Sequence, residues 1–362
     1  MKTWRFAAFF IFCWSCRPAA VVPENTESAV AEAVNPYLLF GGVSSVSVGI
    51  VDEKKTQTFH FGSAFIEKSI PPNDSTLYAI GDLTQVFTAT LIADLILEGK
   101  IRLSDSLDRH IPFAVPDYNG EKPQIGQLLT HTAGLPFEIE PEYQSLTSLE
   151  KALVYKDFAQ TDFQTFLQTY PLPYPPGTRY NYSRSGMGVL GYVLTAVTGS
   201  SWPDFLAERI TSPLGMRDTK PLDQMNSIQF DRLSEAWSST QKPLTHYQWG
   251  EYRGAASLNS SVADLLRLLA EEMDPLSPLS DAFELTRVSR FDLGAGISLG
   301  MGWEIKQKAD NTVYYQSGEA AQAAFVAFDY EKKRGVVVLC GTPGAGSAEG
   351  IGWAVMDFLE TL

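Results

Sequence analysis

A mostly apolar run covers residues 86–97, where polar side chains are sparse. A run of this length with so few polar positions predicts a helix that is buried on most sides. Gly99 is a residue at which such a helix readily ends. At the other end, Asp82 has the side chain of an N-cap, and Gln85 follows three residues later, close to a capping box. The pattern therefore predicts a central buried helix that Asp82 caps.

Strand patterns occur near both ends of the chain. Residues 45–51 alternate with period two, a charged turn follows, and residues 57–62 predict the returning strand of a hairpin. Four further candidate strands precede a final helix at residues 348–359, and they cover residues 300–305, 313–315, 323–328 and 335–340.

Helical patterns fill the middle of the chain. They cover residues 148–154, 158–169, 189–199 and 202–210, together with a helix that ends near residue 269 and is capped by Ser260 or Ser261. Early strands, a helical middle and late strands predict an α+β fold. In this fold both ends of the chain share one antiparallel sheet, terminal helices flank the sheet, and a mainly helical domain is inserted in the middle.

Composition places the chain among globular proteins and excludes one class of partner. Apolar residues make up 44% of the sequence and charged residues 19%, which argues against disorder. At 362 residues the chain is long enough for one composite domain or two closely packed ones. The formal net charge of −14 makes nucleic acid an unsuitable partner, because phosphate binding requires clustered Lys and Arg.

The first residues have the pattern of an export signal. Two basic residues precede a short apolar run at residues 6–12, which is too short to span a bilayer. We therefore expect a signal peptide over residues 1–16 and export to the periplasm or cell envelope. Cys16 follows Ser15 in a loose lipobox-like setting, which predicts lipidation and a membrane anchor; the alternative is a plain signal peptide cut near Ala19.

Two expectations follow for the rest of the N-terminal region and for the cysteines. Residues 17–36 suit a tether, although residues 29–34 also fit the start of an N-terminal helix. Beyond Cys16 only Cys340 remains, within an apolar strand pattern, where it is best explained as a small buried hydrophobe. No disulfide, zinc-binding spacing, metal site or cofactor is expected.

Four segments of the chain carry recognisable motifs. They are Y-A-I-G-D-L-T-Q-V-F-T-A at residues 78–89, I-G-Q-L-L-T-H-T-A-G-L-P at 125–136, P-G-T-R-Y-N-Y-S-R at 176–184 and A-A-S-L-N-S-S-V-A-D-L at 255–265. These motifs resemble those of the serine β-lactamase and penicillin-binding-protein superfamily, in particular its β-lactamase-related, class C-like esterase branch, where the first motif reads F-x-I-G-S-x-T-K-x-F-T-A. The resemblance implies a β-lactamase/transpeptidase-like domain over residues 37–362. Its sheet part covers about 37–78 and 295–362, and its helical part covers about 79–294.

The residues that carry the family's chemistry are altered in this chain. Asp82 occupies the position of the nucleophilic serine and Gln85 that of the lysine, while Tyr182 is retained and Arg184 replaces an asparagine. On the far wall, Gln316 replaces the His or Lys of the family's third motif, and Gly318 is retained.

Acylation needs a nucleophile in contact with a proton acceptor. A carboxylate at position 82 would give an anhydride, and the amide of Gln85 cannot accept a proton near neutral pH. Loss of one member of a catalytic unit costs nearly as much rate as loss of all its members. We therefore expect a pseudoenzyme, and we follow the resemblance in giving His131 a structural role.

Two roles are open for the altered site. Asp82 and Gln85 fit a capping role, and an ion pair between Asp82 and Arg184 would plug the pocket. The positions expected to contact a ligand are Asp82, Tyr182, Arg184, Gln316 and Glu319. The expected ligands are a cell-wall fragment, a small amphiphile or another envelope protein.

Two competing interpretations also stand. One is a structural lipoprotein with a vestigial cleft. The other is an active serine hydrolase (an esterase, a D-amino-acid peptidase or a β-lactamase-like enzyme) with a rebuilt nucleophile. For the second, hydroxyl groups near the motifs occur at Ser75, Thr84, Thr88, Ser183, Ser185 and Ser317.

Overall fold

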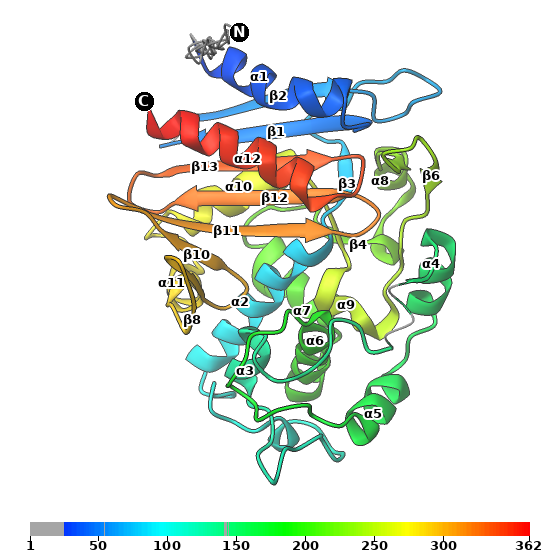
Figure 1. Ribbon diagram of the computed structural model, residues 1–362, viewed down its shortest axis with the longest axis vertical. Coiled ribbons are helices and arrows are strands. Elements are labelled where there is room, and N and C mark those ends of the chain that lie inside the picture. The colour runs from blue at the N-terminus through cyan, green and yellow to red at the C-terminus, as the bar shows by residue number, and fades with distance from the viewer. Residues whose placement is uncertain (1–24, 54, 141–142, 144) are drawn as a thin grey trace, which may run out of the picture.

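The computed structural model describes residues 25–53, 55–140, 143 and 145–362. Its largest element is an eight-stranded sheet with the strand order β2-β1-β13-β12-β11-β10-β9-β8, in which all neighbours are antiparallel. The strands are β1 (Ser45–Asp52), β2 (Lys55–Gly62), β8 (Phe291–Gly294), β9 (Ile297–Leu299), β10 (Glu304–Gln307), β11 (Thr312–Glu319), β12 (Ala323–Asp329) and β13 (Arg334–Cys340). Because β13 pairs with β1, both ends of the chain share one sheet, which confirms the prediction (Figure 1).

Two terminal helices, α1 (Thr26–Leu39) and α12 (Ala345–Glu360), cover one face of this sheet (Figure 1). Val30 and Val34 of α1 share a buried cluster with Ile351 and Val355 of α12 and with inward residues of the strands. The tether expected over residues 17–36 is therefore wrong from Thr26 onward, and the helix that the sequence offered as an alternative is present. Buried valines at this spacing make α1 part of the folded domain.

The opposite face of the sheet packs against the helical part of the chain (Figure 1). The helices are α2 (Thr84–Leu97), α3 (Ile125–Leu129), α4 (Ser148–Lys156), α5 (Gln160–Thr169), α6 (Arg184–Thr198), α7 (Trp202–Leu206), α8 (Ser227–Phe230), α9 (Arg253–Ala256), α10 (Val262–Glu272) and α11 (Ser280–Arg287). A π-helical turn, Ala207–Thr211, continues α7. Small sheets are formed by β3 (Leu77–Ala79), β7 (Leu258–Ser261) and β4 (Lys220–Pro221), and by β5 (Ala236–Trp237) and β6 (Pro243–Leu244).

The central helix is as buried as its sequence predicts, but its beginning differs. Helix α2 is buried over most of its length and starts at Thr84, with Leu83 at the N-cap position and no side-chain cap bond. Asp82 lies one residue earlier, inside a single 3-10 turn, η1 (Gly81–Leu83). The predicted capping role of Asp82 is therefore wrong, because residues 81–83 are already wound and the carboxylate is turned toward another partner.

Other element boundaries moved by a few residues. Helix α6 begins at Arg184 rather than near residue 189, because the Ser183 side chain accepts a hydrogen bond from the Gly186 amide. Residues 300–303, predicted as strand, precede β10, which starts at Glu304. Ser261 caps α10, as one of the two predicted alternatives requires.

Two glycines let η1 lie directly against β11. A Cβ atom on Gly318 would lie 2.0 Å from the Ile80 carbonyl oxygen and 2.7 Å from the Leu83 amide nitrogen. Gly81 has a φ of +50°, and a Cβ there would lie 2.4 Å from the Glu319 backbone. Only glycine permits this approach, which places Asp82 beside the end of β11.

Some predictions concern residues outside the described part. The signal peptide over residues 1–16 and lipidation of Cys16 lie there. Among the described residues, none of the helices has both the length and the apolar character needed to cross a membrane. Cys340 is buried in β13, where burial raises the pKa of its thiol to about 12, so it behaves as a small apolar residue.

Candidate functional site

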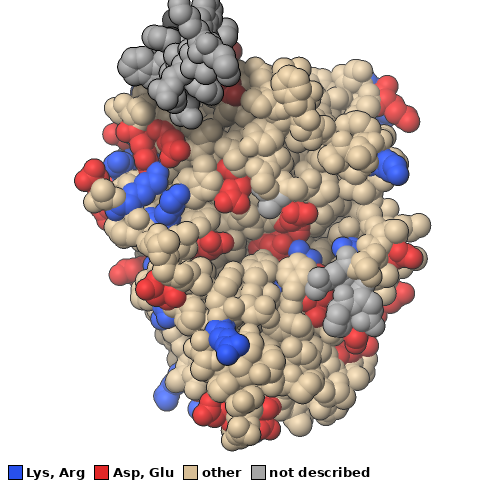
Figure 2. Space-filling view, in the orientation of Figure 1, with Lys and Arg blue, Asp and Glu red and all other residues tan. Residues whose placement is uncertain are grey.

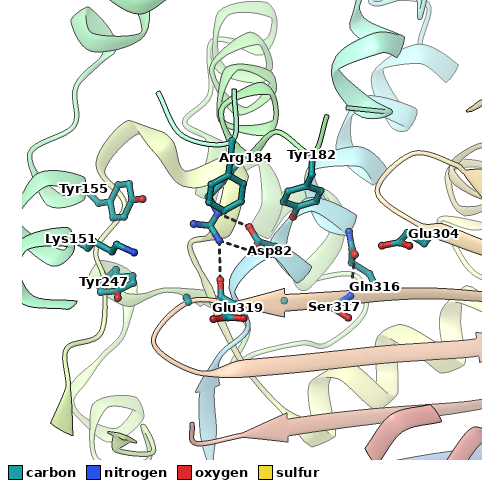
Figure 3. Close-up of a pocket in the computed structure, with 13 residues that line it drawn as sticks. Asp82, Lys151, Tyr155, Tyr182, Arg184, Tyr247, Glu304, Gln316, Ser317 and Glu319 are labelled. Carbon is teal, nitrogen blue, oxygen red and sulfur yellow. Dashed lines mark hydrogen bonds and ion pairs between the residues drawn. The ribbon is translucent and has the colours of Figure 1, made fainter. Parts of the chain in front are cut away.

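A cavity of about 500 Å³ opens between the end of β11 and the helical part of the chain (Figure 3). Residues from η1, α4, α6, β10 and β11 contribute to its wall. They are Asp82, Phe137, Lys151, Tyr155, Tyr182, Arg184, Tyr247, Glu304, Gln316, Ser317, Gly318, Glu319 and Ala320. The structure therefore brings together five of the six motif-equivalent positions that the sequence singles out; Gln85 lies just behind the wall.

Arg184 lies at the centre of this cavity and is held by two carboxylates. Its Nε and Nη2 atoms donate to the two carboxylate oxygens of Asp82, each at 2.7 Å. Nη1 donates to Glu138 Oε1 at 2.7 Å, and Nη2 also reaches the Glu319 carbonyl oxygen at 3.2 Å. The expected ion pair between Asp82 and Arg184 is thus present, in the two-pronged geometry that a guanidinium favours.

The ion pair is shielded from solvent. The exposed fractions of the side chains are 11% for Arg184, 9% for Asp82 and 3% for Glu138. Burial alone would lower the pKa of Arg184, but the attraction of Asp82 and Glu138 is stronger and raises it well above its usual value. Burial raises the pKa of Glu138, and Arg184 opposes that shift. Arg184 therefore remains charged near neutral pH.

The other two positions of the altered catalytic unit contact each other. Gln85 Nε2 donates to Tyr182 Oη at 2.8 Å and lies 3.4 Å from Asp82 Oδ1. Burial, assisted by the negative charge of Asp82, raises the pKa of Tyr182 well above its usual value. Tyr182 therefore stays neutral, and no base at position 85 withdraws its proton.

On the far wall, Gln316 is held by backbone groups. Its Nε2 atom donates to the Gly302 carbonyl at 3.1 Å, and its Oε1 atom accepts from the Ser317 amide at 3.0 Å. A neutral amide held in this way brings no charge to a substrate, in contrast to the lysine or histidine of the family pattern.

His131 has a structural position behind the site. Its Nδ1 atom accepts a hydrogen bond from the Ser183 amide at 3.2 Å, and its ring lies 4.5 Å from that of Tyr182. Burial lowers the pKa of His131 to about 4, so the ring is neutral near pH 7. It fixes the start of α6 and supports Tyr182.

The hydroxyl groups considered as replacement nucleophiles have other partners. Ser183 and Ser185 donate to the Pro136 carbonyl, and Ser317 Oγ donates to Glu349 Oε2 at 3.2 Å. The rest bond to neighbouring groups: Ser75 to Asn73, Thr84 to the Leu258 amide, and Thr88 to the Gly254 carbonyl. In the part of the chain that the structure describes, none of these hydroxyls is hydrogen-bonded to a lysine or histidine side chain.

Sequence reasoning missed two carboxylates of the site. Glu138 lies two residues beyond the motif that ends at Pro136. The sequence assigned Arg184 one carboxylate partner, Asp82, and the expected burial of this pair was a signal that a second partner could be present. Glu304 lies at the first residue of β10, next to the fully buried Trp303. No local pattern marks its approach to the cavity, because that depends on the pairing of β10 with β11. No group of three His, Cys, Asp or Glu side chains suited to a metal occurs within the described residues.

The fold is of the serine β-lactamase/transpeptidase type. Its sheet is covered by two terminal helices, a helical part is inserted between the strands, and the turn that carries Asp82 faces Tyr182 and Arg184. The model of the Beta-lactamase family matches residues 30–359, and the chain belongs to that family.

Known proteins agree with this assignment. A beta-lactamase of Escherichia coli K12 is 25% identical over 298 residues, which cover 80% of this chain and 73% of that protein. A beta-lactamase of Pseudomonas fluorescens is 23% identical, covering 78% and 75%. Protein flp of Staphylococcus aureus N315 is 22% identical, covering 87% and 63%. A solved class C beta-lactamase superimposes with a TM-score of 0.80 at 18% identity, covering 94% of this chain and 98% of that one, which shows the shared fold.

Proposed function

We propose that this protein is a catalytically inactive member of the family that binds a ligand in the former catalytic cleft. The observation that carries the proposal is the ion pair at position 82, where both oxygens of Asp82 accept charge-assisted hydrogen bonds of 2.7 Å from Arg184. A carboxylate held in this way is a poor nucleophile, and Gln85 supplies no base.

The cavity supports a binding role. Its volume of about 500 Å³ falls within the range typical of small-molecule sites, and its wall combines aromatic rings with a few polar groups. The ligand classes that we propose are a fragment of the cell wall or a small amphiphile. A purely structural protein with an empty cleft would show no ligand-induced rise in melting temperature, whereas a ligand that binds only the native state must raise it.

We also propose that the protein is exported to the cell envelope and anchored through a lipid on Cys16. The proposal rests on the basic and apolar pattern of residues 1–16. Mass spectrometry of the mature N-terminal peptide tests it directly. A diacylglyceryl mass on an N-terminal Cys16 is expected, and an unmodified N-terminus near Ala19 would contradict the anchor.

The test of inactivity is intact-mass spectrometry after incubation with a fluorophosphonate and, separately, with a penicillin. A class C beta-lactamase serves as the positive control. We expect no adduct on this protein with either reagent. A stoichiometric adduct would overturn the proposal, and peptide mapping would identify the nucleophile.

A matched variant sharpens the comparison. The triple variant Asp82→Ser, Gln85→Lys, Arg184→Asn restores three residues of the family pattern and removes the ion pair together with the arginine. We expect it to gain a fluorophosphonate adduct at position 82, because the serine would then have a lysine three residues later on the same helix face. Ser317, beside Glu349, is the residue that mapping would test first if the unaltered protein reacted.

A further inference from the structure

The arginine at the centre of the cleft is already paired with carboxylates. Arg184 is paired with both Asp82 and Glu138, so these three groups together carry one net negative charge. Glu304 and Glu319 add two carboxylates to the cavity wall, and Lys151 adds one ammonium group. Figure 2 shows acidic side chains gathered across the middle of this face, where the surface is hollowed. The cleft is therefore negative, which is unfavourable for an anionic ligand.

Glu304 is the carboxylate that lacks a cation. One oxygen, Oε2, accepts a hydrogen bond from Tyr315 Oη at 2.7 Å, and no ion pair of Glu304 occurs within the described residues. Its side chain points toward Gln316 and Tyr182 (Figure 3). Burial raises the pKa of Glu304, and the bond from Tyr315 only partly offsets this shift. A partly buried carboxylate gains free energy from an opposite charge at close range.

Aromatic rings line the same cavity. Phe137, Tyr155, Tyr182 and Tyr247 contribute to its wall, and Tyr180 lies next to Glu304 in an adjoining small cavity. Burial, assisted by the charge of Glu304, raises the pKa of Tyr180 to about 12. Of these rings, Tyr182 and Tyr180 lie at the Glu304 end of the cavity, where a cation would be attracted both by the carboxylate and by the aromatic rings.

We propose that the cleft binds an organic cation, a protonated amine, with Glu304 as its counter-ion and Tyr182 beside it. The inference rests on the proposed binding function of this cleft and gives that function a ligand class. A site that binds substrates with a carboxylate needs a positive charge. This cleft is negative instead, because Gln316 provides no positive charge and the charge of Arg184 is already balanced by its carboxylate partners.

Lys151 places a condition on the orientation of the ligand. It projects from α4, on the same side of Arg184 as Tyr155 and Tyr247, whereas Glu304, Gln316 and Tyr182 lie on the other side (Figure 3). An ammonium group therefore belongs at the Glu304 end of the cavity, away from Lys151. Removal of Lys151 deletes a like charge and leaves the proposed counter-ion intact.

The experiment compares three probes of one shape: benzylamine, which is protonated near pH 7, benzyl alcohol, which is neutral, and benzoate, which is anionic. Binding to the full mature protein is measured by calorimetry and by ligand-observed NMR. We expect benzylamine to bind at least about tenfold more tightly than benzyl alcohol, and benzoate to bind weakest. Glu304→Gln keeps an acceptor for Tyr315 and should remove the preference for the amine. Lys151→Gln should increase the affinity for benzylamine, because it removes a like charge from the cavity.

Three results would overturn the inference: equal affinity for amine and alcohol, no binding of benzylamine at millimolar concentration, or a preference for the amine that survives Glu304→Gln. If Glu304→Gln does not fold, the relative affinities of benzylamine, benzyl alcohol and benzoate for the unaltered protein and for Lys151→Gln still test whether the cleft prefers a cation. Labelling by the fluorophosphonate, in contrast, bears only on inactivity. A protein that is not labelled and shows no amine preference would refute the ligand class alone.

Discussion

Arg184 is the residue on which the altered site depends. It stabilises two carboxylates that are almost completely buried, and a buried charge without its partner is costly. Its guanidinium also lies 4.7 Å from the Phe137 ring and 5.6 Å from the Trp249 ring. Through these contacts Arg184 both stabilises the wall of the cleft and fills part of its centre.

We expect Arg184→Ala to lower the free energy of unfolding by about 3–5 kcal/mol, because Asp82 and Glu138 would then lack a counter-ion. Arg209→Ala is the matched control, since Arg209 pairs with Asp94 and Glu98 near the surface and should cost about 1 kcal/mol or less. Chemical denaturation measures both changes. A loss below about 1 kcal/mol for Arg184→Ala would show that solvent readily replaces the arginine.

Glu272 gives a second prediction at the scale of one residue. It is 1% exposed on α10, and burial raises the pKa of its carboxyl to about 8, a shift that Arg287 and Trp303 partly oppose. Because the folded pKa exceeds the unfolded one, the native state binds this proton more tightly. The stabilisation is complete below about pH 4.5 and is lost progressively as pH rises to about 8.

We therefore expect Glu272→Gln to stabilise the protein above pH 8, by a few kcal/mol on the order of the shift, and to have little effect near pH 4. Glu284→Gln, at an exposed position of α11, is the control and should change stability equally little at both pH values. Melting temperature as a function of pH is the measurement. An equal effect of Glu272→Gln at low and high pH would contradict the assignment of a buried, protonated carboxyl.

At the scale of elements, the close approach of η1 to β11 fixes the geometry of the site. Gly318 makes it possible, because a methyl group at that position would overlap the Ile80 carbonyl. We expect Gly318→Ala to destabilise the protein by about 1–3 kcal/mol and to weaken any ligand of the cleft, since η1 must move away from the strand.

Gly346→Ala in α12 is the control for this change, because nothing lies within 4 Å of its added methyl group and alanine favours helix. Its stability should be unchanged or slightly higher. If Gly318→Ala were as stable as this control, η1 could move away from β11 at little cost, and the close contact would not fix the geometry of the site.

Sequence patterns predicted the elements well where alternation or an apolar run was sustained. The alternating residues of β1 and the apolar runs of α2, β12 and β13 are patterns of this kind, and the order of the elements gave the shared sheet. The beginning of α2 was misplaced because the 3-10 turn before it packs against β11, which is distant in the sequence. The beginning of α6 was misplaced because the local cap that Ser183 provides to the Gly186 amide was not recognised. The pair of Asp82 and Arg184 was predictable from aligned motifs, whereas Glu138 and Glu304 reach the cavity only through tertiary packing.

At the scale of the whole molecule, α1 is a structural part of the domain. Val34 is fully buried between α12 and the sheet. We expect Val34→Asp to lower the free energy of unfolding by about 3 kcal/mol or more, because it buries a charge without a partner. Glu32→Ala, on the exposed side of α1, should change it by less than about 0.5 kcal/mol. Equal stability of both variants would restore the tether interpretation for this segment.

The pairing of β1 with β13 also determines the order in which the protein can assemble. Val46 lies opposite Cys340, so β1 is synthesised long before the strand with which it pairs. Until then the hairpin β1–β2 has an unpaired edge, and closing the large intervening loop costs entropy before any contact is gained. The sheet therefore cannot be completed before β13 has been synthesised, and its formation depends on contacts between residues far apart in the sequence.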